Sequence, residues 1–115
     1  MSKAIQIGTV SVLPGEVKRG AIEAGADMAG RPYAMPITVV RGVADGPCLW
    51  INGATHGDEP EGAFSIFLAL KQIDPQQLRG TVVAVPAMNV NAFTAGTRGD
   101  PLDTFSYDMN RIYPG

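Results

Sequence analysis

Apolar and polar residues alternate at the start of the chain, and this period of two predicts β-strands. We expect a strand from Ile5 to Val12 that ends at a turn over residues 13–15, and a weaker strand over residues 17–24. Residues 27–32 contain glycine and proline and predict a loop. The β-branched run 37–40 predicts another strand, so this part of the chain should be β-rich.

A continuous apolar run, Cys48-Leu49-Trp50-Ile51, follows a predicted turn at residues 45–47. A run without polar alternation is typical of a strand that is buried on both faces of a parallel sheet. Cys48 is therefore expected to be an inert core thiol. The run 81–85 has the same character and predicts a second buried strand.

The segment between these two strands predicts a helix, at about residues 60–73. Asp58 is placed to cap this helix, and Pro60 suits its first turn, where the missing N–H costs nothing. The apolar residues form two stripes, so the helix should be covered on two sides. The order strand, helix, strand predicts a right-handed crossover between parallel strands. From residue 86 onward the pattern indicates little regular structure.

Composition narrows the classes of protein that fit. The chain has 115 residues, 45% hydrophobic and 17% charged, which suits one globular domain or part of one. The formal net charge is −2 and there is no basic tract, so nucleic acid is not an expected partner. No apolar stretch approaches the roughly 20 residues that cross a bilayer, so no membrane association is expected. With no signal-peptide stretch and a single cysteine, we expect a cytoplasmic protein.

The lone histidine lies where such a sheet collects ligands. His56 follows the first parallel strand and Glu59 opens the helix, and ligands bind at the carboxyl ends of parallel strands. Imidazole and carboxylate are both normal zinc ligands, so a metal site is one interpretation. An exposed loop histidine beside a glutamate favoured by the helix dipole is the other. Asp58 would cap the helix or orient His56, and Glu61 would stabilise the helix dipole or act as a general base.

Two arginines supply the second group of candidates. Arg98 and the pair Asn110-Arg111 lie in the loop-rich region after the second parallel strand. Arginine can hold a carboxylate with two parallel hydrogen bonds, and an adjacent amide can add a third. Asp108 can pair with either arginine, and the alternative for each arginine is an ordinary surface charge. A serine hydrolase is disfavoured because Ser65 and Ser106 lack a histidine partner that is not already assigned.

Two separated motifs resemble those of a known family. Asn52-Gly53-Ala54-Thr55-His56-Gly57-Asp58-Glu59 resembles the first metal-binding motif of the succinylglutamate desuccinylase/aspartoacylase family, which belongs to the zinc carboxypeptidase-like hydrolases. Asp108-Met109-Asn110-Arg111-Ile112-Tyr113-Pro114-Gly115 resembles its D-[LM]-N-R-x-[FY]-P-G motif. Residues 86–98 are similar to the connecting segment, and residues 35–47 to the lead-in. The resemblance covers nearly the whole chain.

The resemblance implies an α/β fold of the zinc carboxypeptidase-like type, with a mixed or parallel sheet and flanking helices. His56 and Glu59 would be the first two ligands of a zinc ion, or of another divalent ion that accepts nitrogen and oxygen ligands. Asn110 and Arg111 would hold the carboxylate of the substrate, and Arg98 would bind substrate or polarise the scissile carbonyl. The implied reaction is hydrolysis of the amide bond of a small-molecule N-acyl amino acid, with zinc lowering the pKa of its bound water.

The chain departs from the family in one respect. The family takes a third zinc ligand, a histidine, and a glutamate general base from the later half of its domain, whereas His56 is the only histidine here. Residues 1–115 are therefore expected to be an inactive N-terminal part, with a lead-in at 1–34 and the metal- and carboxylate-binding half at 35–115. The missing half or a second copy of the chain would be its partner. A non-catalytic metal- or carboxylate-binding domain, or a zinc carboxypeptidase acting on small peptides, are the alternatives.

Overall fold

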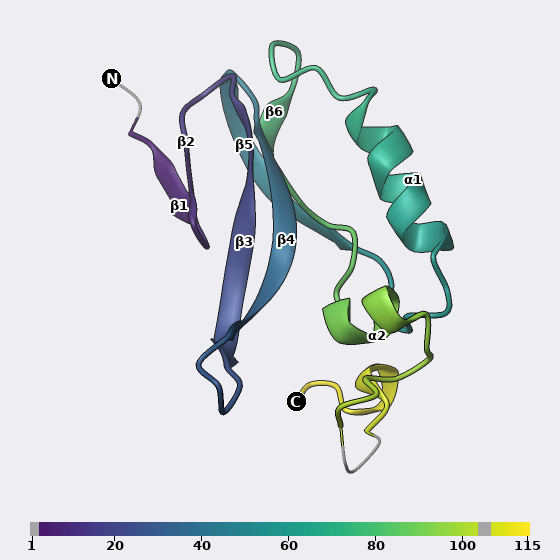
Figure 1. Cartoon of the computed structure of the whole chain (residues 1–115). Coiled ribbons are helices and arrows are strands. Elements are labelled where there is room, and N and C mark those ends of the chain that lie inside the picture. Colours follow the sequence, from purple (N-terminus) through teal and green to yellow (C-terminus); the bar gives the residue numbers. More distant parts are fainter. Residues whose placement is uncertain (1–2, 104–106) are drawn as a thin grey trace.

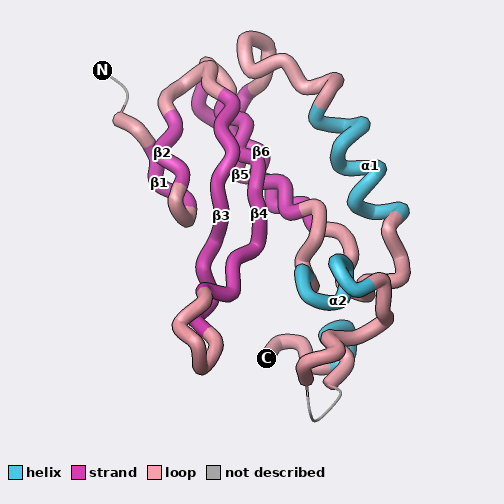
Figure 2. Tube along the Cα trace, in the orientation of Figure 1, coloured by secondary structure: helices cyan, strands magenta, loops and turns pink. Residues whose placement is uncertain are grey.

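The computed structural model describes residues 3–103 and 107–115, and its elements are arranged as a mixed sheet with flanking helices (Figures 1 and 2). The strands are β1 (Ile5–Ile7), β2 (Val10–Val12), β3 (Val17–Ala26), β4 (Pro32–Arg41), β5 (Ala44–Asn52) and β6 (Arg79–Val85). The helices are α1 (Glu61–Leu70), α2 (Val90–Ala95) and the short 3-10 helix η1 (Met109–Arg111). Among the described residues, no helix is long and apolar enough to cross a membrane.

The main sheet has the strand order β3-β4-β6-β5. β3 pairs antiparallel with β4, and β4 pairs antiparallel with β6. β5 and β6 are parallel and are joined through α1, which confirms the predicted element order and parallel pairing. β1 and β2 pair with each other in a separate two-stranded sheet. The predicted mixed α/β architecture is therefore present, with a parallel pair at one end of the sheet.

The core lies between the main sheet and the β1–β2 hairpin. Its buried side chains are all β-branched and come from the hairpin, from β4 and from β6: Val10, Val12, Ile37, Val39, Val83 and Val85. α1 lies on the opposite side of the sheet, where it buries Ala63 and Ile66 (Figure 1). β6 thus contributes to the packing on both faces, and six of its seven residues are buried.

The predictions for β5 were only partly right. A strand does include residues 48–51, but it lies at the end of the strand order, and all of its residues except the half-buried Ile51 are exposed. Leu49 is 57% and Trp50 43% exposed, and Cys48 is an exposed thiol, so the predicted core thiol is wrong. The predicted turn at 45–47 is also wrong, because these residues lie inside β5, where the pairing register shifts between Ala44 and Cys48.

The helix predictions need a similar correction. α1 begins after Pro60, which takes the N-cap position without a side-chain cap, so Asp58 does not cap the helix. Phe64 is 68% and Phe67 50% exposed, which means that α1 is covered on one side rather than two. The segment after β6 is also more regular than predicted, since it contains α2 and η1.

The N-terminal predictions hold with changed bounds. Residues 5–12 form the two short strands of a hairpin instead of one strand. β3 is longer than the predicted 17–24 and pairs with β4 along most of its length. Asp27 organises the predicted loop by accepting hydrogen bonds from the backbone N–H groups of Ala29 and Arg31.

Candidate active site

The loop after β5 and the segment after β6 lie side by side at the carboxyl ends of the two parallel strands. The N–H of Met88 donates to the carbonyl of Gly53 (2.9 Å), and the N–H of Asn89 donates to that of Ala54 (3.1 Å). The buried amide of Asn89 also donates to the carbonyl of Thr55 (3.4 Å). Ala54 has a φ of +49°, a conformation that costs an L-residue about 1–2 kcal/mol. These hydrogen bonds hold the backbone that leads into His56.

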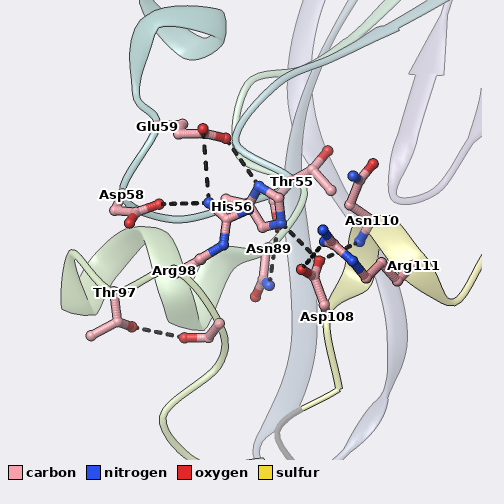
Figure 3. A network of polar contacts seen from close by, with 11 residues as sticks. Thr55, His56, Asp58, Glu59, Asn89, Thr97, Arg98, Asp108, Asn110 and Arg111 are labelled. Carbon is pink, nitrogen blue, oxygen red and sulfur yellow. Dashed lines mark hydrogen bonds and ion pairs between the residues drawn. The ribbon is translucent and has the colours of Figure 1, made fainter.

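His56 is buried, 7% exposed, and a carboxylate lies at each of its ring nitrogens (Figure 3). Nδ1 is 3.0 Å from Oε2 of Glu59, and Nε2 is 2.7 Å from Oδ1 of Asp108. A carboxylate of this kind is an acceptor, so Nε2 carries a hydrogen and donates to Asp108. The imidazole is therefore fixed in direction, with Nδ1 turned toward Glu59.

These contacts shift the protonation of both partners. Hydrogen bonds to Asp108 and then to Glu59 raise the pKa of His56 above its ordinary value of 6.5. The hydrogen bond from His56, assisted by the N–H of Asn110, lowers the pKa of Asp108 below 3.8. Each shift favours the charged form of its group, since opposite charges and hydrogen bonds stabilise the ionised state.

Asp108 also fixes the direction of Arg111. Its Oδ2 accepts from Nη1 of Arg111 at 2.6 Å, while Oδ1 accepts from the backbone N–H of Asn110 at 2.9 Å. The second of these contacts caps η1. One carboxylate thus connects the imidazole of His56 with the guanidinium of Arg111, whose side chain is 68% exposed and available to a ligand.

Arg98 approaches the same loop from the segment after α2. Its Nη1 lies 3.8 Å from Oε1 of Glu59 and 4.0 Å from Oδ1 of Asp58. The carbonyl of Arg98 accepts from the N–H of Gly57 at 3.2 Å, so the two segments are joined through their backbones. The guanidinium is held beside the acids of the loop while its side chain remains 54% exposed.

A cavity of about 290 Å³ opens beside His56, Arg98 and Asp108. It is lined by residues from the loop after β5 and from the segment between α2 and η1: His56, Arg98, Gly99, Asp100, Tyr107 and Asp108. A second, larger and mainly apolar cleft of about 700 Å³ lies between the β3–β4 hairpin and α2. Asp100 lines both spaces, and the smaller one contains the candidate chemistry.

A model of the succinylglutamate desuccinylase/aspartoacylase catalytic domain matches residues 45–115, which include the whole of this site. The chain belongs to the succinylglutamate desuccinylase/aspartoacylase family. A relative is the N-alpha-acetyl-L-2,4-diaminobutyric acid deacetylase of Halomonas elongata, 37% identical over 81 residues, or 70% of this chain and 23% of the relative.

Two solved structures are similar to this chain. Succinylglutamate desuccinylase/aspartoacylase from Rhodobacter sphaeroides is 32% identical with a TM-score of 0.73, covering 86% of this chain and 30% of the other. The product-bound ectoine utilization protein EutE (DoeB) from Ruegeria pomeroyi is 28% identical with a TM-score of 0.79, covering 100% and 35%. The chain thus spans about a third of these structures and about a quarter of the curated relative.

The spacing of the candidate ligand atoms can be compared with the coordination geometry of a zinc ion. Two donors that bind one tetrahedral zinc at about 2.0–2.1 Å lie roughly 3.3 Å apart. Nδ1 of His56 and Oε2 of Glu59 are 3.0 Å apart, and both are ordinary zinc donors, so this pair fits an ion. Asp108 is placed as the carboxylate that holds a metal-bound imidazole in one tautomer. No cluster of three or more candidate ligands occurs among residues 3–103 and 107–115.

The sequence-predicted residues converge, with one exception. His56 and Arg111 contact Asp108, while Glu59 contacts His56 and Arg98 lies beside Glu59. The predicted pairing of Asp108 with an arginine is confirmed for Arg111. Asn110 lies beside Arg111, as predicted by their adjacency (Figure 3).

Asp58 is the exception, because it lies near Arg98 rather than near the ring of His56. The orienting carboxylate is Asp108, which sequence reasoning assigned only to an arginine. Its distance from His56 along the chain leaves no local periodic signal. Ser65 donates to the carbonyl of Glu61 within α1, and Ser106 lies outside the described residues.

Proposed function

We propose that this chain carries the metal-binding and carboxylate-binding part of a zinc-dependent deacylase that hydrolyses the amide bond of an N-acyl amino acid. The observation that carries the proposal is the position of His56 between Glu59 and Asp108, at 3.0 Å and 2.7 Å. The family assignment and a relative named as a deacetylase of an acetylated amino acid support the same reaction class.

His56 and Glu59 would hold the zinc ion through Nδ1 and a carboxylate oxygen. Zinc would supply Lewis-acid chemistry there, by lowering the pKa of a water molecule and polarising a carbonyl. With zinc bound, Asp108 would keep the hydrogen of His56 on Nε2, and the lone pair of Nδ1 would serve the metal. His56 is the only histidine in the sequence, so this chain supplies one imidazole to the site.

The substrate would be held by its carboxylate. Arg111 presents a guanidinium whose direction is set by Asp108, and Asn110 is its neighbour in the chain. A planar guanidinium binds a carboxylate through two parallel hydrogen bonds, and the amide can add one more. Arg98, which lines the cavity together with His56 and Asp108, would bind the substrate or donate to the scissile carbonyl.

Zinc binding to the 115-residue chain tests the ligand assignment. We expect zinc to shift the ring resonances of His56 in NMR spectra and to bind measurably in calorimetry. Glu59→Gln should weaken zinc binding at least about tenfold, since an amide is a poor zinc ligand. Glu61→Gln is the matched control, because Glu61 is the acid two residues later, in the first turn of α1. Equal zinc affinity in the Glu59→Gln variant and the wild type would contradict the proposal.

Binding of Nα-acetyl amino acids tests the carboxylate site separately. Arg111→Lys keeps the charge but loses the planar fork, so the affinity for Nα-acetyl amino acids should fall about tenfold. Arg79→Lys, at the start of β6 and remote from the cavity, should leave it unchanged. Unchanged binding in the Arg111→Lys variant would remove Arg111 from the site.

A further inference from the structure

The outer face of α1 carries three large apolar side chains that remain exposed. The helix packs against β5 and β6 on the side that buries Ala63 and Ile66. Phe64, Phe67 and Leu68 lie outside this contact and are 68%, 50% and 59% exposed. Figure 1 shows α1 at the edge of the molecule, with no other described element over its outer side. This face of the helix is therefore open to a partner.

The exposed side chains form one continuous stripe along the helix. Residues three and four apart are neighbours on a helix surface, so Phe64 lies beside both Phe67 and Leu68. Lys71, at the C-cap, continues the same row one turn later. Single exposed apolar side chains are normal on a protein surface, whereas a contiguous apolar patch marks an interaction site. We call Phe64, Phe67 and Leu68 the α1 stripe.

The two ends of the α1 stripe carry opposite charges at symmetric positions. Glu61 lies in the first turn and Lys71 caps the last, and neither forms an ion pair within the described part of the chain. Ile66 lies midway between Glu61 and Lys71, and it is also the midpoint of Phe64 and Leu68. Two antiparallel copies of α1, related by a two-fold axis at the level of Ile66, therefore bring Glu61 to Lys71 of the partner subunit. The same axis brings Phe64 to Leu68 of the partner subunit.

This self-complementarity identifies a second copy of the chain as the partner. A two-fold interface uses the same patch on both subunits, so each residue must find its complement on that patch. A surface shaped for a different partner needs no such symmetry. Full burial of an aromatic side chain removes about 150–250 Å² from water, so the α1 stripe offers roughly 300 Å² on each copy. Stable dimers bury about 800 Å² on each partner, which means that this face supports a weak dimer.

We propose that two copies of this chain associate through the outer faces of their α1 helices, packed antiparallel. Burial of the α1 stripe supplies the free energy of association, and the charges fix the direction. A parallel arrangement would bring Glu61 to its own copy and Lys71 to its own copy. No residue of α1 lines the cavity beside His56, so this interface is independent of the proposed function.

Sedimentation equilibrium of the full 115-residue chain measures the association directly. The average mass should rise from 12.1 kDa toward twice that value as the protein concentration increases. For a contact of this size we expect a Kd on the order of 0.1 mM. A mass that stays at 12.1 kDa up to about ten times this concentration would overturn the proposal.

A charge exchange tests the antiparallel arrangement. Lys71→Glu places two acids together at both ends of the interface, and Glu61→Lys places two lysines together there. Each single variant should weaken the dimer at least about tenfold, because like charges repel. The double variant restores opposite charges at both ends, so its Kd should return to within about threefold of the wild-type value. An effect confined to the helix dipole of one copy would give no such rescue of association.

An aromatic truncation tests the apolar part of the interface independently. Phe67→Ala removes a large side chain from both copies and should also weaken the dimer at least about tenfold. Tyr33→Ala is the matched control, because Tyr33 is an aromatic residue with a similar exposure of 41% that lies at the start of β4. That variant should leave the Kd unchanged. The far-UV circular dichroism spectra of all variants should match the wild type, since the substituted side chains are exposed.

The outcomes decide between this interface and others. A dimer that persists unchanged in Phe67→Ala and in both single charge variants would overturn the proposal, because association would then use another surface. Weakening by both single variants without rescue in the double variant would overturn the antiparallel arrangement. If Phe67→Ala does not fold, the charge series still decides.

Discussion

The backbone N–H of Gly57 donates to the carbonyl of Arg98 across 3.2 Å, and this contact joins the loop after β5 to the segment after α2. A side chain at position 57 has no room, because its Cβ would overlap the backbone of Ala92 and the carbonyl of Thr97. The glycine is required by this close approach and not by a turn. The position of Arg98 beside Glu59 therefore depends on a residue that bears no functional group.

Gly57→Ala should push the segment of Arg98 away from the loop of His56. We expect it to lower the free energy of unfolding by about 1–3 kcal/mol, as overpacking typically does. Gly99→Ala is the matched control: Gly99 lines the same cavity, but a Cβ there would meet no atom within 4 Å. Urea unfolding of both variants measures the difference. Equal stability of the two variants would show that this close contact does not exist in solution.

The single histidine makes its titration directly observable. In the metal-free protein, NMR should give a pKa for His56 above 6.5, because Asp108 and Glu59 both accept from its ring. Asp108→Asn should lower this pKa, since Asp108 contributes the largest effect. Asp58→Asn, on the same loop but not in contact with the ring, should change it less. An unaltered pKa in Asp108→Asn would show that the 2.7 Å contact is not formed.

The same pair gives the metal-free protein a pH dependence with a defined sign. The pKa of His56 is raised on folding, so its contribution to stability is complete below 6.5 and is lost as the pH rises through the folded pKa. The pKa of Asp108 is lowered, so its contribution is present above 3.8 and is lost as the pH falls through the folded pKa. Asp108→Asn should therefore cost most stability between these two values, as measured by urea unfolding across the pH range.

Ala54 offers a test of the backbone that leads into the site. Its φ of +49° is tolerated by glycine and resisted by β-branched residues. Ala54→Gly should change the free energy of unfolding by less than about 1 kcal/mol, because relief of strain offsets the loss of a buried methyl. Ala54→Val should cost more than about 2 kcal/mol, since it adds both strain and volume at a buried position. The reverse order of stability in thermal unfolding would be incompatible with this conformation.

The packing of the sheet against the β1–β2 hairpin can be tested at Val39, which is fully buried. Val39→Ala removes two methyl groups and should cost roughly 2–3 kcal/mol, including the cavity left behind. Val43→Ala, at a side chain that is 49% exposed, should cost much less. A similar loss of unfolding free energy in both variants, measured by urea unfolding, would show that Val39 does not lie in the core.

The sequence predicted the parts of this fold that depend on local pattern. The β-branched runs of β4 and β6, the helix between β5 and β6, and their parallel pairing all follow from period, propensity and chain order. The exposure of β5 could not be predicted, because an apolar run such as Leu49-Trp50-Ile51 gives the same sequence pattern in the middle of a sheet as at its end. What lies on the second side of a strand is a property of the whole assembly and not of the segment.

The site divides in the same way. His56 and Glu59 are three residues apart on one loop, so their contact can be inferred from spacing alone. Asp108 reaches His56 only because α2 and the following segment fold back over the loop, and no periodicity reports such a long-range contact. Asn110 and Arg111 were candidates from their residue types and from the motif resemblance, whereas the position of Asp100 at the cavity became visible only in three dimensions.

The place of β6 between β4 and β5 has a consequence for the order of folding. β3 and β4 are neighbours in the chain and close a short loop, whereas β6 must find β4 across the whole of β5 and α1, which is a slow, non-local event. The two segments that line the candidate cavity follow β5 and β6, so the cavity should form in that last event. In stopped-flow refolding, the fluorescence of Trp50, the sole tryptophan, and the binding of an Nα-acetyl amino acid should recover at the same rate. Ligand binding recovered well before the Trp50 signal would contradict this order. A substitution in β6 that slows folding, such as Val83→Ala, would then delay the formation of the site without altering its native structure.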